Sequence, residues 1–160
     1  MKNERAGTSA IIISVKLLPL YRVCFTYPEG WELALSAPVS TEGQHFYLAE
    51  GTCEGRIQGK FRGANHPRRR GDGTFEPNFQ GVIETNDGAV IFFDYSGYGR
   101  AYPIGRRQIV AAASHLSDHE NYRWLNDSLA VGAGEVRTLS EDHVELVIDW
   151  SEIIWEPIPE

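Results

Sequence analysis

The chain has 160 residues, the length of one ordinary domain, which buries enough surface to fold without a disulfide framework or a structural metal. Its formal net charge of −7 and its pI of about 5.2 disfavour nucleic acid and anionic lipid as partners, because both present negative charge. Two cysteines, Cys24 and Cys53, are too few for a disulfide framework and are expected to be free thiols of a cytoplasmic protein.

In chain order, residues 1–9 are expected to form a disordered tail, and residues 10–160 a single β-barrel domain. The apolar run from Ala10 to Leu20 is interrupted by polar residues and a proline. It is therefore too short for a membrane span, which needs ~20 apolar residues, and it has no cleavage site typical of a signal peptide.

Runs of alternating apolar and polar residues predict β-strands along the rest of the chain, and no stretch of twelve or more residues has helical periodicity. The expected elements are strands at 20–27, 44–53, 56–63, 108–115, 125–131, 136–139 and 144–155, a hairpin within 80–96, and a short helical turn within 117–124. Gly132 to Gly134 is expected to bend the chain between two strands. Glycines at every fourth position from Gly51 to Gly63 are expected to share one face and to allow tight curvature or the close approach of another segment.

These eight or nine short strands, with at most a short helical turn, predict an all-β fold. A closed antiparallel β-barrel is favoured, and a β-sandwich is the alternative. We expect over about a third of the residues in strands and under about a tenth in α-helix.

Asp87-Gly88, between the β-rich runs GVIET and AVIFFDY, is the clearest hairpin signal in the chain. A two-residue loop at these positions, with Gly88 at positive φ, pairs Glu84 with Ile91. In that register Glu84 and Asp94 lie on opposite faces, so one of these two carboxylates is expected to face the interior.

Three segments of the chain carry a resemblance to a known family: GTCEGRIQGKFRGANHPRRRGDG, GVIETNDGAVIFFDYSGYGR and YRWLNDSLAVGAGEV. They resemble the bacterial and fungal proteins grouped as domain of unknown function 3237 (UPF0311-like), with T-x-D-G-A at residues 85–89 and Trp124-Leu125-Asn126 as the best marks. The resemblance implies a calycin-like, lipocalin-like β-barrel and brings no established activity. The arginine run at residues 68–70 departs from the family pattern.

An eight-stranded barrel is just wide enough inside for side chains or one small ligand, so function is expected in the cavity or at its mouth. Glu84, Asp94 and Glu135 are the candidate acids or bases, because a carboxylate among apolar side chains is readied for proton transfer near neutral pH. The alternative is that each faces outward or pairs with an arginine. Tyr98 and Asn126 are the candidate orienting donors.

Arg62, Asn65 and Arg69 are candidate ligand-binding residues, because an arginine fork matches a carboxylate or phosphate. The alternative for the arginine run at 68–70 is a solvated loop that pairs with the excess acid of this protein.

Aromatic residues with polar tips, at Tyr98, Tyr102, Tyr122 and Trp124, either line a pocket for an aromatic ligand or form ordinary core. Trp124 and Asn126 are expected to share the cavity face of a strand, with Leu125 outside the cavity.

His115 and His119 have a spacing that can bind zinc on a helix, but no third ligand is evident, so neither a metal nor a cofactor is expected. The leading functional hypothesis is a cofactor-independent acid/base enzyme, of the lyase, isomerase or cyclase type, acting on an aromatic or apolar metabolite. A non-catalytic binding protein for such a molecule and a structural subunit are the alternatives. Exposed strand edges and the apolar segment Trp150–Pro159 predict a homodimer.

Overall fold

The computed structural model describes residues 13–35, 42–101 and 107–160. The expected tail at residues 1–9 and the candidate Tyr102 lie outside this part of the chain. The strands are β1 (Lys16–Ala34), β2 (Gly43–Gly55), β3 (Gly59–Asn65), β4 (Arg68–Arg69), β5 (Phe75–Glu76), β6 (Asn78–Thr85), β7 (Val90–Ala101), β8 (Arg107–Leu116), β9 (Leu129–Ser140) and β10 (His143–Ile154). A 3-10 helix, η1 (Arg123–Asp127), is the one helical element among the described residues, and no described helix is long and apolar enough to cross a membrane.

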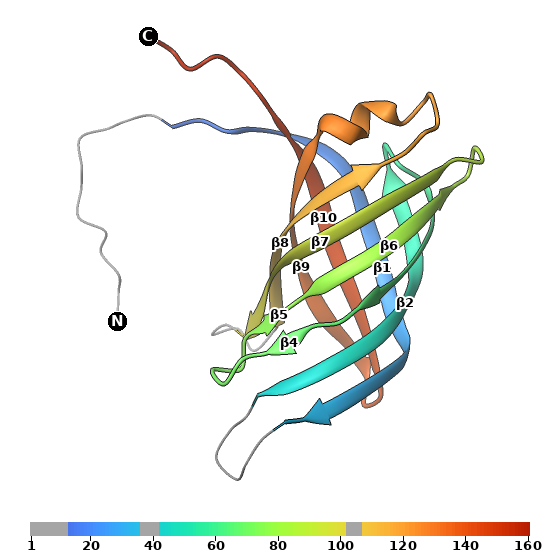
Figure 1. Ribbon diagram of the computed structural model, residues 1–160, viewed down its shortest axis with the longest axis vertical. Coiled ribbons are helices and arrows are strands. Elements are labelled where there is room, and N and C mark those ends of the chain that lie inside the picture. The colour runs from blue at the N-terminus through green and yellow to red at the C-terminus, as the bar shows by residue number, and fades with distance from the viewer. Residues whose placement is uncertain (1–12, 36–41, 102–106) are drawn as a thin grey trace.

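Eight of the strands close into an antiparallel barrel (Figure 1). The ring runs β1-β10-β9-β8-β7-β6-β3-β2 and is completed by the pairing of β2 with β1. The two-residue strands β4 and β5 form a small hairpin that bridges β2 and β7 at one end of the barrel. The closed antiparallel barrel is thus confirmed, although β1, with 19 residues, is much longer than the short strands expected.

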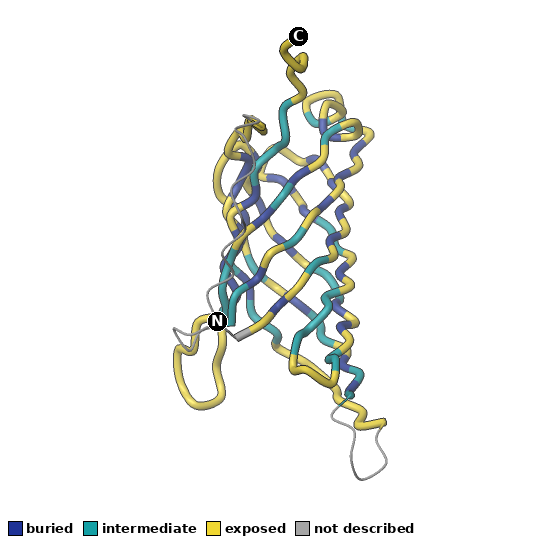
Figure 2. The backbone as a smooth tube through the Cα atoms, turned by 90° about the vertical axis from the view of Figure 1, so that its left-hand side faces the viewer, coloured by how far each residue is buried: buried dark blue, intermediate teal, exposed yellow. Residues whose placement is uncertain are grey.

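Side chains at alternate positions of each strand point inward and fill much of the barrel interior. Buried and exposed positions follow one another along the strands (Figure 2), as they do in a sheet with one face toward the core. The centre of the core is a cluster of aromatic rings in mutual contact, contributed by Phe25, Phe61, Phe79, Phe93 and Tyr95. Offset and edge contacts of this kind stabilise a core beyond the area that they bury.

The 3-10 helix closes one end of the barrel. Leu125 is fully buried beneath η1, and the Asn126 amide holds both backbone groups of Ser117 on the preceding segment. Figure 1 shows η1 at the opposite end of the barrel from the β4–β5 hairpin. The expected strand over 125–131 is therefore partly wrong, since its first residues belong to the helical turn and β9 begins at Leu129.

Gly132 and Gly134 lie within one continuous strand, β9, so the expected bend between two strands is wrong. A Cβ on Gly132 would come within 2.6 Å of Cε3 of Trp150, a fully buried core residue. The absence of a side chain at Gly132 therefore leaves space for the Trp150 indole and does not mark a turn. The four glycines from Gly51 to Gly63 belong to β2 and β3. A Cβ on any of them would lie within 3.0 Å of a neighbouring atom, so the close approach of another segment expected there is confirmed.

The β6–β7 hairpin has a longer loop than the two residues expected. The Thr85 amide donates to the Ala89 carbonyl, so three residues form the loop, and Gly88 has the expected positive φ, 88°. Glu84 then pairs with Val90 and not with Ile91. Because a shift of one residue moves side chains to the other face, Glu84 and Asp94 both lie outside the barrel. The expectation that one of them faces the interior is wrong.

Candidate functional site

A cavity of about 440 Å³ opens at the end of the barrel opposite η1, where the aromatic core stops. Its wall is largely apolar, with Phe75, Ile109, Val136 and Leu146 among the lining residues. The polar side chains that reach it come from β1, β2, β3, β7 and β8. Such a volume, with a few convergent polar groups on an apolar wall, is typical of a small-molecule site.

Tyr27 of β1 is the centre of the first polar group in this cavity. Its hydroxyl accepts a hydrogen bond from Nδ2 of Asn65 at 2.9 Å and is also bonded to the hydroxyl of Tyr95. The Asn65 side chain is fixed in turn, because its Oδ1 accepts from the Asn78 amide at 3.0 Å. Burial raises the pKa of Tyr27 to about 12, although the bonds from Asn65 and Tyr95 oppose that rise. Tyr27 is therefore a neutral donor held in one orientation.

His45 and Tyr47 of β2 form the second polar group, with the Tyr47 hydroxyl 3.0 Å from Nδ1 of His45. The imidazole is 4% exposed, and its Nε2 has no hydrogen-bond partner among the described residues. Burial lowers the pKa of His45 and raises that of Tyr47, so both groups are neutral near pH 7. The rings of Tyr27 and Tyr47 stack at a centroid distance of 4.6 Å, which places the two polar groups side by side.

Two arginines lie at the entrance. Arg107 lines the cavity, with its guanidinium carbon 4.4 Å from the centre of the Phe75 ring. Nη2 of Arg69 lies 3.5 Å from the point where a Cβ on Gly43 would stand, and Nε2 of His45 lies 3.4 Å from the same point. Arg69, which pairs with Gly43, therefore lies on the same side of the sheet as the imidazole.

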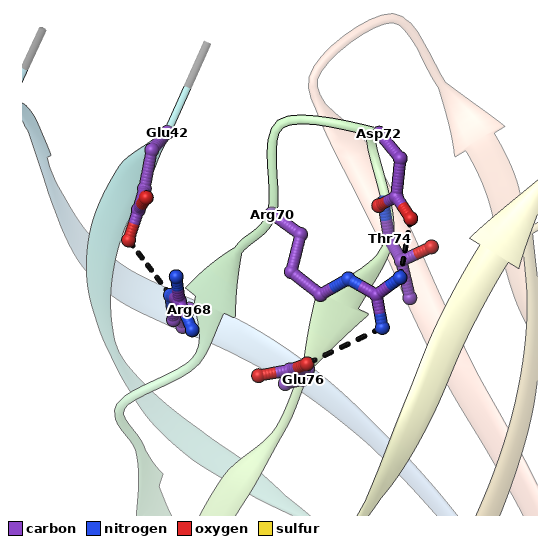
Figure 3. A network of polar contacts seen from close by, with 6 residues as sticks. All are labelled: Glu42, Arg68, Arg70, Asp72, Thr74 and Glu76. Carbon is purple, nitrogen blue, oxygen red and sulfur yellow. Dashed lines mark hydrogen bonds and ion pairs between the residues drawn. The ribbon is translucent and has the colours of Figure 1, made fainter. Parts of the chain in front are cut away.

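The neighbours of Arg69 in the chain, Arg68 and Arg70, each contact carboxylates, as Figure 3 shows. Arg68 donates to Glu42 at 2.7 Å, and Arg70 contacts both Asp72 and Glu76. The alternation of a strand thus divides the arginine run: Arg68 and Arg70 pair with surface carboxylates, while the side chain between them faces inward.

None of the three candidate carboxylates lies in the cavity. Glu84 forms an ion pair with Arg62 on the outer surface, and Asp94 is exposed and accepts from the Ser114 hydroxyl at 3.3 Å. Glu135 accepts from Arg137, two residues along β9 on the same outward face. These carboxylates and Arg62 occupy outward positions of their strands. None of the four side chains lines the cavity.

The aromatic candidates are also placed elsewhere. Tyr98 is 50% exposed on the outside of β7. Trp124 lies in η1 at the closed end, where its ring is covered by the guanidinium of Arg56, and Tyr122 donates to Asp87 at the same end. Asn126 is exposed and Leu125 is buried, the reverse of the expected arrangement, because a 3-10 helix replaces the strand on which it was based.

Asn65 is the predicted ligand-binding residue that does line the cavity. Tyr27, Tyr47 and Arg107, which line the cavity, and His45, which bonds to Tyr47, were not predicted from the sequence. A signal was present for two of them: in His45-Phe46-Tyr47 the polar-tipped residues alternate with an exposed phenylalanine, so they share the inward face of β2.

Both histidines of the H-x-x-x-H spacing are engaged by other groups. Nε2 of His115 bonds to the Tyr21 hydroxyl at 2.7 Å inside the barrel, and Nδ1 of His119 accepts from the Asn121 amide. Among the described residues, no group of three histidine, cysteine or acidic side chains is placed to hold a metal ion. Cys24 and Cys53 are free thiols.

Solved structures of several proteins share this barrel. A β-barrel-like protein from Acinetobacter baumannii matches with a TM-score of 0.75 and 19% identity, over 91% of this chain and 100% of that chain. A conserved protein of unknown function from Rhodopseudomonas palustris matches with a TM-score of 0.72 and 17% identity, over 90% and 100% of the two chains. A protein from Penicillium herquei described as an enzyme matches with a TM-score of 0.69 and 21% identity, over 92% and 100%. At these identities the likeness establishes the fold alone.

No curated protein matches the sequence. The model of the family described as protein of unknown function DUF3237 matches residues 16–153, which include the residues of the cavity and all of the barrel strands except the last residue of β10. The chain therefore belongs to the DUF3237 family.

Proposed function

We propose that the chain is a cofactor-independent enzyme that moves protons on an aromatic or apolar small molecule held in the open-end cavity. The observation that carries this proposal is the pair of ordered polar groups, Tyr27 with Asn65 and Tyr47 with His45, side by side on an apolar wall. Nε2 of His45 is buried without a hydrogen-bond partner among the described residues, which costs stability and would serve no purpose in a protein that only sequestered an apolar molecule.

Each group has a defined part in the reaction. With Asn65 and Tyr95 bonded to its oxygen, Tyr27 has its own proton available for a substrate carbonyl, where it stabilises the negative charge of an enolate. Tyr47 removes a proton from the carbon beside that carbonyl while its own hydroxyl proton passes to Nδ1 of His45. The products are an enolate and a protonated imidazole, so charge and protons balance. Return of the proton to another carbon completes an isomerisation, and loss of a leaving group from the enolate completes an elimination.

The proposal is tested by exchange of carbon-bound hydrogen for deuterium. A panel of aryl ketones with an acidic C–H beside the carbonyl is incubated with the protein in D₂O, and incorporation is followed by NMR. We expect exchange with the unmodified protein and a loss of ~100-fold or more in Tyr47→Phe and in Tyr27→Phe. Tyr98→Phe, which removes a hydroxyl from the outer surface, is the matched control and is expected to exchange at the unmodified rate.

Exchange at equal rates in all four proteins would contradict the assignment of the two tyrosines. Tight binding of the ketones with no exchange in any of them would replace the enzyme by the alternative function, a protein that binds such molecules without turnover.

A further inference from the structure

Arg107 is a half-buried cation whose charge is not matched nearby. Its Nη1 donates to the Gly99 carbonyl at 3.4 Å, and its guanidinium lies over the Phe75 ring. Among the described residues, no carboxylate lies within ion-pair distance of it. Two other arginines at this end, Arg68 and Arg70, do have such a partner.

A second positive charge increases the cost of this arrangement. Burial lowers the pKa of Arg107, and the charge of Arg69 lowers it further. Desolvation and a like charge both disfavour a cation, so the free protein holds Arg107 in an unfavourable environment. A bound anion would offset both effects, because it would replace the lost hydration and separate the two positive charges.

The two sides of the cavity entrance carry opposite charges, so an anion is attracted to one side only. Among the described lining residues, Glu32 has the only carboxylate, and it lies on β1, opposite His45 in the register of β1 with β2. Its charge acts on His45 and Tyr47 rather than on Arg107. An anionic ligand is therefore attracted to the Arg107 side of the entrance and repelled from the Glu32 side.

We propose, on the basis of the function proposed above, that the substrate carries a carboxylate on its aromatic body, and that Arg107, with Arg69 beside it, binds this carboxylate at the cavity entrance. A guanidinium donates two parallel hydrogen bonds to a carboxylate, which fixes the orientation of the ligand as well as its position. The aromatic body then extends along the apolar wall toward Tyr27 and Tyr47.

The test compares matched pairs of ligands by titration calorimetry. Aryl carboxylates of one to three rings are each paired with the corresponding neutral amide. We expect the carboxylates to bind at least ~10-fold more tightly than the amides. Arg107→Gln should abolish this difference and leave the affinity for the amides unchanged, whereas Arg107→Lys should retain part of it. Arg62→Gln, which removes the same charge from the outer surface, is the control and should keep the full preference.

Equal affinities for carboxylate and amide throughout the panel, or no binding of any carboxylate at millimolar concentration, would overturn this inference. A preference that persists in Arg107→Gln would overturn it as well. These outcomes are separate from the deuterium exchange of neutral ketones: exchange without a carboxylate preference would leave the proposed function standing, and a preference without exchange would leave the anion site standing.

Discussion

His115 and Tyr21 form a polar pair deep inside the barrel, between the aromatic core and the closed end. The imidazole is 2% exposed, and burial lowers its pKa to about 4. Nε2 of His115 and the Tyr21 hydroxyl are hydrogen-bonded to each other at 2.7 Å. Each of these two buried atoms therefore has a hydrogen-bond partner within the protein. Neither Tyr21 nor His115 lines the open-end cavity, so we expect this pair to affect the stability of the fold and not ligand binding.

This pair predicts a decline in stability between pH 6.5 and pH 4. The unfolded chain binds a proton at His115 near pH 6.5, whereas the folded protein does not bind it until about pH 4. Unfolding therefore takes up a proton in this window, and the free energy of unfolding falls by about 3 kcal/mol as the pH is lowered through it. Urea unfolding at several pH values measures this term as the difference from the double variant Tyr21→Phe/His115→Leu. Parallel pH profiles for the two proteins would show that the imidazole is not held neutral.

Asn126 lies at the closed end of the barrel, where its amide bonds to the backbone of Ser117. Its Oδ1 accepts from the Ser117 amide at 2.8 Å and its Nδ2 donates to the Ser117 carbonyl at 3.0 Å. Asn126→Leu leaves both backbone groups without their partner, which costs about 1–3 kcal/mol. We expect a lower melting temperature with unchanged affinity for any ligand of the open-end cavity. A loss of affinity without a loss of stability would place the ligand at the closed end instead.

Two glycines in neighbouring parts of the sheet give a matched comparison at the scale of the strand. Gly132→Ala of β9 brings a methyl group to 2.6 Å from Trp150, whereas Gly99→Ala of β7 finds its nearest neighbour, Phe75, at 3.7 Å. The first substitution overpacks the core and is expected to cost about 1–3 kcal/mol, and the second to cost little. Chemical denaturation of both variants checks this. Equal stabilities would mean that the indole of Trp150 moves aside without penalty.

The β6–β7 hairpin gives a prediction about backbone conformation. Gly88 has a φ of 88° and no atom within 4 Å of the position of a Cβ, so a side chain there meets no obstacle but strains the backbone. Gly88→Val is expected to cost on the order of 1 kcal/mol or more, and Gly88→Asn less, because asparagine tolerates this conformation. Thermal unfolding of the two variants measures the difference, and identical melting temperatures would contradict it.

The same hairpin shows how far a sequence defines an element. The Asp87-Gly88 signal predicted the turn and the positive φ correctly, because both are local properties of two residues. The loop length is not local: it depends on whether the Thr85 amide or its neighbour bonds across the turn. That single difference reverses the face on which Glu84 lies, and with it the prediction of a buried carboxylate.

At the scale of the whole molecule, the sequence predicted the barrel but not which end of it is hollow. Closure follows from the number and alternation of the strands. The location of the cavity follows instead from where large aromatic side chains, such as Phe79 and Phe93, gather on inward positions of strands far apart in the chain. Asn65 was predicted because it lies with several arginines on a glycine-linked stretch, whereas Tyr27 and Tyr47 look like ordinary strand residues in the sequence.

The expected homodimer stays a prediction, and the structure indicates where to test it. The pairing of β1 with β2 begins at Tyr21. The residues of β1 that precede Tyr21 pair only with the end of β10. This ribbon exposes Leu17, Leu18 and Trp155, the last of them 82% accessible. Light scattering is expected to give twice the monomer mass at micromolar concentration, and Leu18→Lys to shift it toward the monomer. Phe92→Lys, on the outer face of the barrel, is the control, and a monomer mass for the unmodified protein would reject the dimer.

The barrel has one filled half and one hollow half, and this division has a consequence for how the protein tolerates change. Residues such as Phe61 and Ile148 are buried in the core and do not line the cavity, whereas Trp31 and Val144 line the cavity, are exposed and lie outside the core cluster. Substitutions at this exposed part of the wall therefore draw little on the packing that stabilises the fold. A library randomised at the wall should consist mostly of folded proteins, so that new ligand preferences can be selected directly, without first stabilising the scaffold.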